Sequence, residues 1–214
     1  MGNLLSHVRF FDLSEATGIR YESLFDSIEG WTQYVQGGGL IGLVPGEVDM
    51  SGGIGAGDYA ILNKFLAVPH WSPVYSQKRK IKSNIQFSFK SGGSDDNFFG
   101  TGFYPVPGQG FGFRYKSDGI YGYVTMDPDY SEVGLITELV APWEQVAIVE
   151  ATFFPGSRVQ FTAFDGLALH VGNITDLLPE GDDFSGVPIG FQVSQGGATA
   201  HTMIFSSCLF FQDI

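Results

Sequence analysis

The chain has 214 residues, with 11 basic and 23 acidic side chains and a formal net charge of −12. Hydrophobic residues make up 43% of the sequence and charged residues 16%, so it can bury a core and is not typical of a disordered protein. The acidic excess disfavours phosphate backbones, which bind to clustered Lys and Arg, and no apolar run is long enough to span a membrane. We therefore expect neither a nucleic-acid nor a membrane partner.

Residues 1–18 are set apart from the rest of the chain, because "NLLSHVRFFDLSEATG" precedes the first strand-like run. It is either an extension packed along the domain or a docking arm for another subunit. We therefore divide the chain into an arm, 1–18, and one domain, 19–214. The first residues show no charged segment followed by an apolar one, so no signal peptide is visible. We expect a soluble protein; its compartment stays open, and a virion or an extracellular surface is favoured.

From residue 21 onward the sequence predicts strands and turns. Runs rich in aromatic and β-branched residues are separated by "SGG", "SDG", "PGS" and "QGG", whose glycines favour turns. The expected strands are 21–27, 31–36, 40–44, 59–68, 81–90, 98–104, 110–116, 119–126, 133–139, 144–154, 158–166, 167–171, 189–195 and 201–211. Many short strands with such turns indicate an all-β, antiparallel β-sandwich of the jelly-roll type, with an up-and-down barrel as the alternative.

Alternation within the runs supports this fold class. Ile85, Phe87 and Phe89 would share one face of a strand, and Val159 and Phe161 one face of another. The one cysteine, Cys208, lies in the apolar run "MIFSSCLFF". We expect it to be a buried small hydrophobe.

The order of the segments resembles the concanavalin A-like superfamily, which includes legume lectins, laminin-G-like modules and glucanases. "LFDSIEGWTQYVQGGG" is similar to its opening, which often has the form F-D-x-x-x-x-W. "ATFFPGSRVQFTAFDGLALH" is similar to its late hairpin, and "PIGFQVSQGGATAHTMIFSSCLFF" to its closing strands. The resemblance covers residues 22–212 and implies a concanavalin A-like jelly roll. It does not fix the function, because this fold carries lectins, hydrolases and adhesion modules alike.

The stretch "EVDMS", residues 47–51, bears on enzyme activity. Glucanases of this superfamily carry Glu, Asp and Glu at alternate positions of one strand, and a retaining glycosidase needs two carboxyl groups about 5–5.5 Å apart. Here Glu47 and Asp49 match the first two positions and Ser51 occupies the third. We expect a short strand between turns and no enzyme. A glycoside hydrolase with a displaced acid pair is the alternative.

Candidate metal ligands are oxygen atoms of loop residues, which are the ligands that calcium prefers. The candidates are Asp95, Asp96, Asn97, Asp127 and Asp129. None has EF-hand spacing, and the four histidines lack zinc-like spacing. We favour polar turn residues and expect no cofactor, with calcium as the one candidate.

A ligand surface is predicted from loop aromatics. Trp71 and Tyr75 lie between prolines, beside the basic run 78–80, and Tyr104 and Trp143 lie in other loops. These four side chains either bind a glycan or protein partner or cap the ends of the sandwich.

These features favour a non-enzymatic module for surface recognition or assembly. A viral or phage virion structural protein, used in capsid decoration or as a tail component, would suit the arm and the absence of disulfides. Such a protein would be an oligomer or part of an assembly, docked through the arm on other protein subunits. The alternative from another class is a soluble or secreted lectin that binds carbohydrate.

Overall fold

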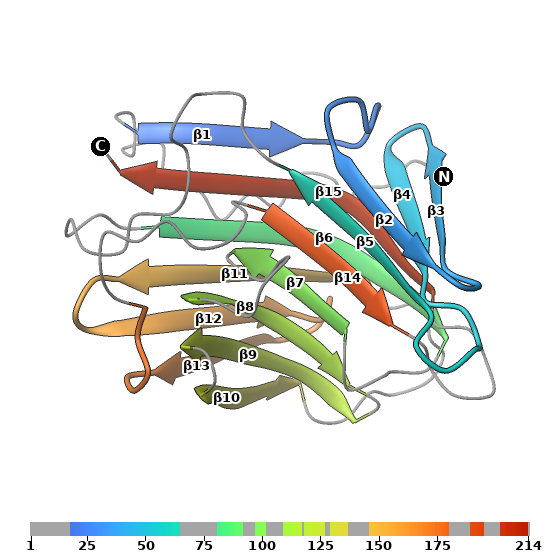
Figure 1. Ribbon diagram of the computed structural model, residues 1–214. Helices are drawn as coiled ribbons and strands as arrows, with labels where there is room; N and C mark the ends of the chain where they lie inside the picture. The colour runs from blue at the N-terminus through green and yellow to red at the C-terminus, as the bar shows by residue number, and fades with distance from the viewer. Residues whose placement is uncertain are drawn as a thin grey trace.

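The structure is a computed structural model, and it describes residues 18–64, 81–91, 97–101, 109–116, 118–126, 129–136, 146–179, 189–194 and 202–213. These ranges form fifteen β-strands (Figure 1). None of them contains a helix that is long and apolar enough to cross a membrane. The expected all-β class is confirmed, because the strands pair antiparallel throughout and build two sheets.

The first sheet has eight strands in the order β13-β12-β11-β6-β15-β4-β3, and β1 also pairs with β15. Its strands are β1 (Gly18–Ser23), β3 (Leu40–Val44), β4 (Glu47–Ser51), β6 (Ile81–Ser91), β11 (Val146–Phe154), β12 (Arg158–Phe164), β13 (Leu169–Ile174) and β15 (Thr202–Asp213). The long strand β15 holds the sheet together, because one half of it pairs with β4 and the other half with β1.

The second sheet has seven strands in the order β10-β9-β8-β7-β14-β5-β2. Its strands are β2 (Thr32–Gln36), β5 (Tyr59–Lys64), β7 (Asn97–Thr101), β8 (Gln109–Lys116), β9 (Gly119–Met126), β10 (Asp129–Ile136) and β14 (Ile189–Ser194). Neighbours in space are often far apart in sequence, as where β14 lies between β7 and β5.

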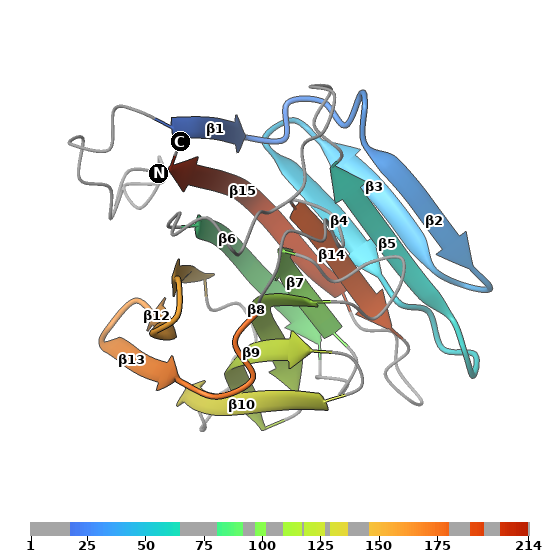
Figure 2. The same cartoon turned by 60° about the vertical axis from the view of Figure 1, so that its left-hand side comes forward.

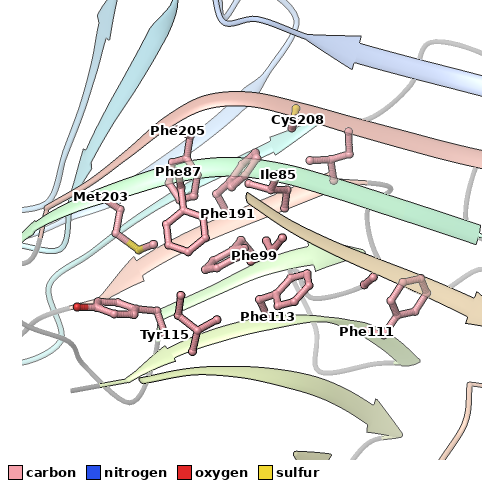
Figure 3. Packing of buried hydrophobic residues seen from close by; sticks show 14 of the residues in the cluster. Ile85, Phe87, Phe99, Phe111, Phe113, Tyr115, Phe191, Met203, Phe205 and Cys208 are labelled. Atoms are coloured by element: carbon pink, nitrogen blue, oxygen red, sulfur yellow. The ribbon is translucent and has the colours of Figure 1, made fainter. Parts of the chain in front are cut away.

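The hydrophobic core lies between the two sheets and is rich in phenylalanine (Figure 3). Phe87 of one sheet and Phe99 of the other have ring centroids 4.6 Å apart, and those of Phe205 and Phe191 are 4.4 Å apart. Strand β12 alternates buried and half-buried residues as its sequence predicts. Cys208 is buried at 1% exposure, which confirms the expected small hydrophobe.

The phrase F-D-x-x-x-x-W becomes part of this core. Phe25 and Trp31 follow β1, and their ring centroids are 5.5 Å apart. Both rings also contact Phe191, at 6.0 and 5.9 Å. Phe25 has a φ of 53°, which a non-glycine residue rarely adopts. Strand β1 therefore ends at Ser23 rather than at residue 27 as expected, because the backbone turns here to bury the ring.

Figure 2 shows the two sides of the sandwich, one with β10 and β13 and the other with β2 and β3. The side chains pack differently at these two sides. At the closed edge, formed by β10 and β13, Gly172 lies against Val133 and Leu135, where an added Cβ would be 2.9 Å from either side chain. Ser131 Oγ also donates a hydrogen bond to Asp176 Oδ1 over 3.2 Å. The closed edge therefore leaves no space between the two sheets.

At the open edge, formed by β2 and β3, the chain passes from one sheet to the other through the turn 37–39. Val35 and Leu43 pair with core-facing residues of the neighbouring strands, yet they are 51% and 41% exposed. The core-facing side of the open edge is therefore in contact with solvent.

Asp58, the residue before β5, packs its carboxylate against the turn 37–39. Asp58 Oδ2 accepts a hydrogen bond from the Gly55 backbone N–H over 2.8 Å. Its carboxylate also lies where a Cβ on Gly37 or Gly53 would be, so both glycines are needed for the close approach. One carboxylate thus lies between two glycine turns and accepts a hydrogen bond from one of them.

Candidate functional site

The outward face of the seven-stranded sheet carries a cluster of aromatic and charged side chains over β8, β9 and β10. We call it the tyrosine surface, and it consists of Arg114, Lys116, Tyr121, Tyr123, Tyr130 and Glu132. Tyr130 is 57% exposed. The other members of the set are half-buried.

Strand alternation positions these side chains. In β8 the residues Phe111, Phe113 and Tyr115 face the core, so Arg114 and Lys116 face outward. The register then places Arg114 beside Tyr121 of β9, while Tyr123 of β9 lies beside Glu132 of β10. Three strands therefore bring the six residues onto one face.

Glu132 forms ion pairs with both cations. Arg114 Nη1 and Lys116 Nζ each lie 2.5 Å from one of the two carboxylate oxygens of Glu132. These charge-assisted hydrogen bonds hold two long side chains in fixed positions. Glu132 therefore belongs to a fixed cluster of charges and is not a freely solvated strand residue.

The cations also contact the rings. The guanidinium carbon of Arg114 is 5.8 Å from the ring centroid of Tyr123 and 5.9 Å from that of Tyr130. Lys116 Nζ is 4.4 Å from the ring centroid of Tyr121. These distances are in the range of cation–π attraction. The rings of Tyr123 and Tyr130 are 5.6 Å apart and tilted by 34°, so they form one aromatic platform.

The phenol of Tyr123 stays protonated at neutral pH. Burial raises its pKa above the ordinary 10.0, while a hydrogen bond with Thr125 and the charge of Arg114 act in the opposite direction. A neutral phenol can donate and accept hydrogen bonds. The surface therefore offers apolar rings and fixed polar groups.

Glycines border this platform on the β8 side. Gly112 pairs with Tyr123, Gly110 pairs with Thr125, and Gly100 of β7 and Gly190 of β14 continue the row from Gly112. Paired residues in an antiparallel sheet point to the same face. Beside Tyr123, three neighbouring strands thus carry no side chain on the outward face at this row.

The residues that the sequence predicted as a ligand surface cannot be placed. Trp71, Tyr75, Tyr104 and Trp143 all lie outside the described residues, as does the basic run 78–80. Sequence reasoning missed the tyrosine surface, because Arg114 and Lys116 are separated by Tyr115. The available signal was alternation: "GFGFRYK" places two cations on one face of its strand, and "GIYGYVTM" places two tyrosines on one face of the next strand.

The candidate calcium ligands are also mostly outside the described residues. Asp95, Asp96 and Asp127 are not described, and for Asn97 only the backbone of β7 is. Asp129 is the first residue of β10 and is exposed, and its carbonyl accepts a hydrogen bond from Thr125 Oγ1. Among the described residues, no three His, Cys, Asp or Glu side chains gather as a metal site would require.

Strand β4 shows how the partial glucanase motif is arranged. Val48 and Met50 are buried in the core, so Glu47, Asp49 and Ser51 share the opposite face. The register places Asp49 beside Gly42 and Ile204. The expected short strand is confirmed, and a serine holds the position of the second glutamate.

One histidine lies beside a carboxylate. His170 Nε2 is 3.0 Å from Asp165 Oδ2, while Asp165 Oδ1 accepts hydrogen bonds from the backbone N–H groups of Leu167 and Ala168. Burial raises the pKa of Asp165, but these hydrogen bonds and His170 outweigh it and lower the pKa below 3.8. The pair closes the turn between β12 and β13. His7, His70 and His201 lie outside the described residues.

Two sheets with this strand order form a concanavalin A-like β-sandwich, as the resemblance implied. Solved structures of that class share the fold. Lectin II from Ulex europaeus superposes with a TM-score of 0.62 at 10% identity, over 92% of this chain and 99% of its own. A protein of unknown function from Shewanella oneidensis MR-1 gives 0.64 at 11% identity, over 95% and 90%.

Botulinum neurotoxin type C, whose cell entry depends on interaction with two ganglioside molecules, is similar over part of its length. The TM-score is 0.60 at 10% identity, and the match covers 92% of this chain and 48% of the toxin chain. No family model matches the sequence, and no curated protein does. At such low identities these likenesses establish the fold alone.

Proposed function

We propose that this protein is a lectin-type, non-enzymatic module that binds glycans at the tyrosine surface. The observation that carries the proposal is the exposed ring of Tyr130, held 5.6 Å from that of Tyr123 on the outward face of the seven-stranded sheet. Sugar rings present apolar C–H faces between hydroxyl groups. A tyrosine offers an apolar ring with a polar tip, which suits such a ligand.

The charged members of the surface favour a polar but weakly charged ligand. Arg114 and Lys116 share one carboxylate, so the three side chains together carry a charge of about +1. This is far from the cluster of cations that a nucleic acid needs. Because the ion pairs hold these groups in place before binding, little side-chain entropy is lost when they bond a hydroxyl.

The solved structures add support by analogy. One of them is a lectin, and the cell entry of another depends on gangliosides, which carry sugars. Fold alone does not fix function. The proposal therefore depends on the tyrosine surface and not on the likeness.

A glycan-array screen followed by calorimetry with the best ligand tests the proposal. We expect Tyr130→Ala to weaken binding at least tenfold, which corresponds to about 1.4 kcal/mol. Tyr34→Ala is the matched control, because Tyr34 is an exposed tyrosine on the same face at the far strand of the sheet. Absence of binding to any glycan, or an equal loss in both variants, would overturn the proposal.

Two finer interpretations of the sequence stay predictions. The virion role rests on the arm 1–18, of which residues 1–17 lie outside the described ranges. It predicts that deleting residues 1–18 abolishes assembly while the domain still folds. The glycoside hydrolase alternative predicts release of reducing sugar from a β-glucan. With Ser51 at the third position of the motif, we expect none.

A further inference from the structure

We propose that the open edge is an interface between two copies of this chain, in which β3 pairs antiparallel with β3 of the second copy about Gly42. Apolar side chains are exposed along the open edge. Those more than two-fifths exposed are Val35, Leu40, Leu43 and Val44. Contiguous apolar exposure of this kind marks interaction sites more often than isolated exposed residues do.

Among the described strands, β2 and β3 each stand at the end of their sheet. In the part of the chain that the structure describes, β3 pairs with β4 alone and β2 with β5 alone. Edge strands of monomers are usually protected by charged side chains or proline. The sequences TQYVQ and LIGLV contain neither. The open edge is therefore suited to pairing rather than protected against it.

The sequence of β3 favours a second copy of this chain as the partner at the open edge. A two-fold axis through Gly42 places Leu40 opposite Val44 of the partner subunit. The same axis places Ile41 opposite Leu43 of the partner subunit and Gly42 opposite itself. Every side-chain pair across the interface would be apolar, and the same patch would be used on both copies, as a two-fold interface requires.

The net charge of the chain limits which surfaces of two copies can come into contact. Each copy carries a formal charge of −12, so copies repel one another at low ionic strength. The two pairing strands are uncharged, so no ionised group is desolvated between them, which would be costly. Glu47 and Asp49 of the neighbouring β4 lie beside Val44 and Gly42 and add to the repulsion. Added salt screens the remaining repulsion. The association should therefore tighten as the salt concentration rises.

Cysteine cross-linking tests the register. Residues opposite each other in an antiparallel pair have Cα atoms about 4.5–5.5 Å apart, within the range of about 4.4–6.8 Å for disulfides. Gly42→Cys should therefore cross-link under mild oxidation. Val44→Cys is the matched control. The two-fold axis places position 44 of one subunit about 13 Å along the strand from position 44 of the other, too far for a disulfide. The natural Cys208 is buried, so its background is low.

The cross-linking result is decisive in either direction. A disulfide-linked dimer in Gly42→Cys without one in Val44→Cys supports the proposed pairing. Equal cross-linking of the two variants, or none in either, overturns it.

Light scattering on the full chain tests the interface without a cross-link. Val44→Lys in β3 and Val171→Lys in β13 compare two valines that are 52% and 55% exposed on edge strands of the same sheet. We expect Val171→Lys to remain dimeric and Val44→Lys to be monomeric, both with the circular dichroism of the parent. A monomeric parent, or loss of the dimer in Val171→Lys alone, overturns the proposal.

Discussion

The two edges of the sandwich differ in how they meet the core. At the closed edge, β10 and β13 press together until only a glycine fits at position 172. At the open edge, β2 and β3 separate enough that Val35 and Leu43, although turned toward the core, remain about half exposed. The same two sheets thus form a packed interior at one side and an apolar surface at the other.

The contrast between the two edges shows that the exposed fraction of a side chain does not by itself identify a binding surface. Val171 at the closed edge and Val44 at the open edge are almost equally exposed. What distinguishes them is the surrounding structure: β13 is flanked by Asp165 and Asp176, which take part in hydrogen bonds, while β3 and β2 carry no charge. A substitution should therefore affect the two edges in different ways.

The largest expected difference in the free energy of unfolding is between substitutions at two glycines of the eight-stranded sheet. Gly172→Val would drive methyl groups into Val133 and Leu135, and we expect a loss of about 2–3 kcal/mol in the free energy of unfolding. At Gly42 an added Cβ would find nothing nearer than Asp49 Cβ at 3.8 Å. Gly42→Val should change stability by less than about 0.5 kcal/mol. Urea unfolding of the two variants measures both, and equal losses would contradict the contrast.

A smaller effect is expected at the turn that joins the sheets at the open edge. Asp58→Ala removes the carboxylate that bonds Gly55 and fills the space among the glycines, at a cost of about 1.5–2 kcal/mol. Asp26→Ala is the control, since Asp26 is exposed. Thermal unfolding should show a lowered midpoint for the first variant and little change for the second. Similar midpoints would mean that Asp58 does not hold the turns.

At the closed edge, Asp165→Asn should cost about 1 kcal/mol at neutral pH, because a charged acceptor is replaced by a neutral one. The pKa of Asp165 is lower in the folded protein than its ordinary 3.8. Its contribution is therefore complete above 3.8 and is lost as the pH falls through the folded-state pKa. The difference between parent and variant should shrink on acidification. A difference that grows in acid would show that the carboxylate is not stabilising.

The smallest effect is expected for Leu43→Thr at the open edge. Leu43 is already 41% exposed, so the folded monomer loses little buried apolar area, and we expect less than about 1 kcal/mol in dilute solution. Leu62→Thr is the matched comparison in the core, where the side chain is fully buried and the loss should be several times larger. Chemical unfolding of both variants at low protein concentration gives the ratio of the two losses in the free energy of unfolding.

Much of the fold could be predicted from the sequence, because it depends on local patterns. Alternation in "RVQFTAF" and glycine turns gave the strands, and the phrase containing Phe25 and Trp31 pointed to the right class of sandwich. The start of β10 was missed. The sequence places the strand at 133, but pairing with β9 begins at Asp129, because Tyr130 and Glu132 continue the outward face.

The candidate site was harder to predict, because it depends on register. Glu132 pairs with cations 16 and 18 residues away in sequence, and only the order β8-β9-β10 brings them together. The predicted aromatics at 71, 75, 104 and 143 were found by loop composition, which says nothing of where a loop lies. They are outside the described residues, and their role stays a prediction.

Strand β15 has a consequence for how the chain must assemble. It is the last of the described strands, yet it lies between β6 on one side and both β4 and β1 on the other. During synthesis, β1, β4 and β6 therefore emerge from the ribosome long before the strand that joins them. Until residues 202–213 have been made, these strands expose apolar faces and unpaired edges, and such nascent species are prone to aggregate. A ribosomal stall before residue 202 should therefore prolong the exposure of these edges and favour aggregation.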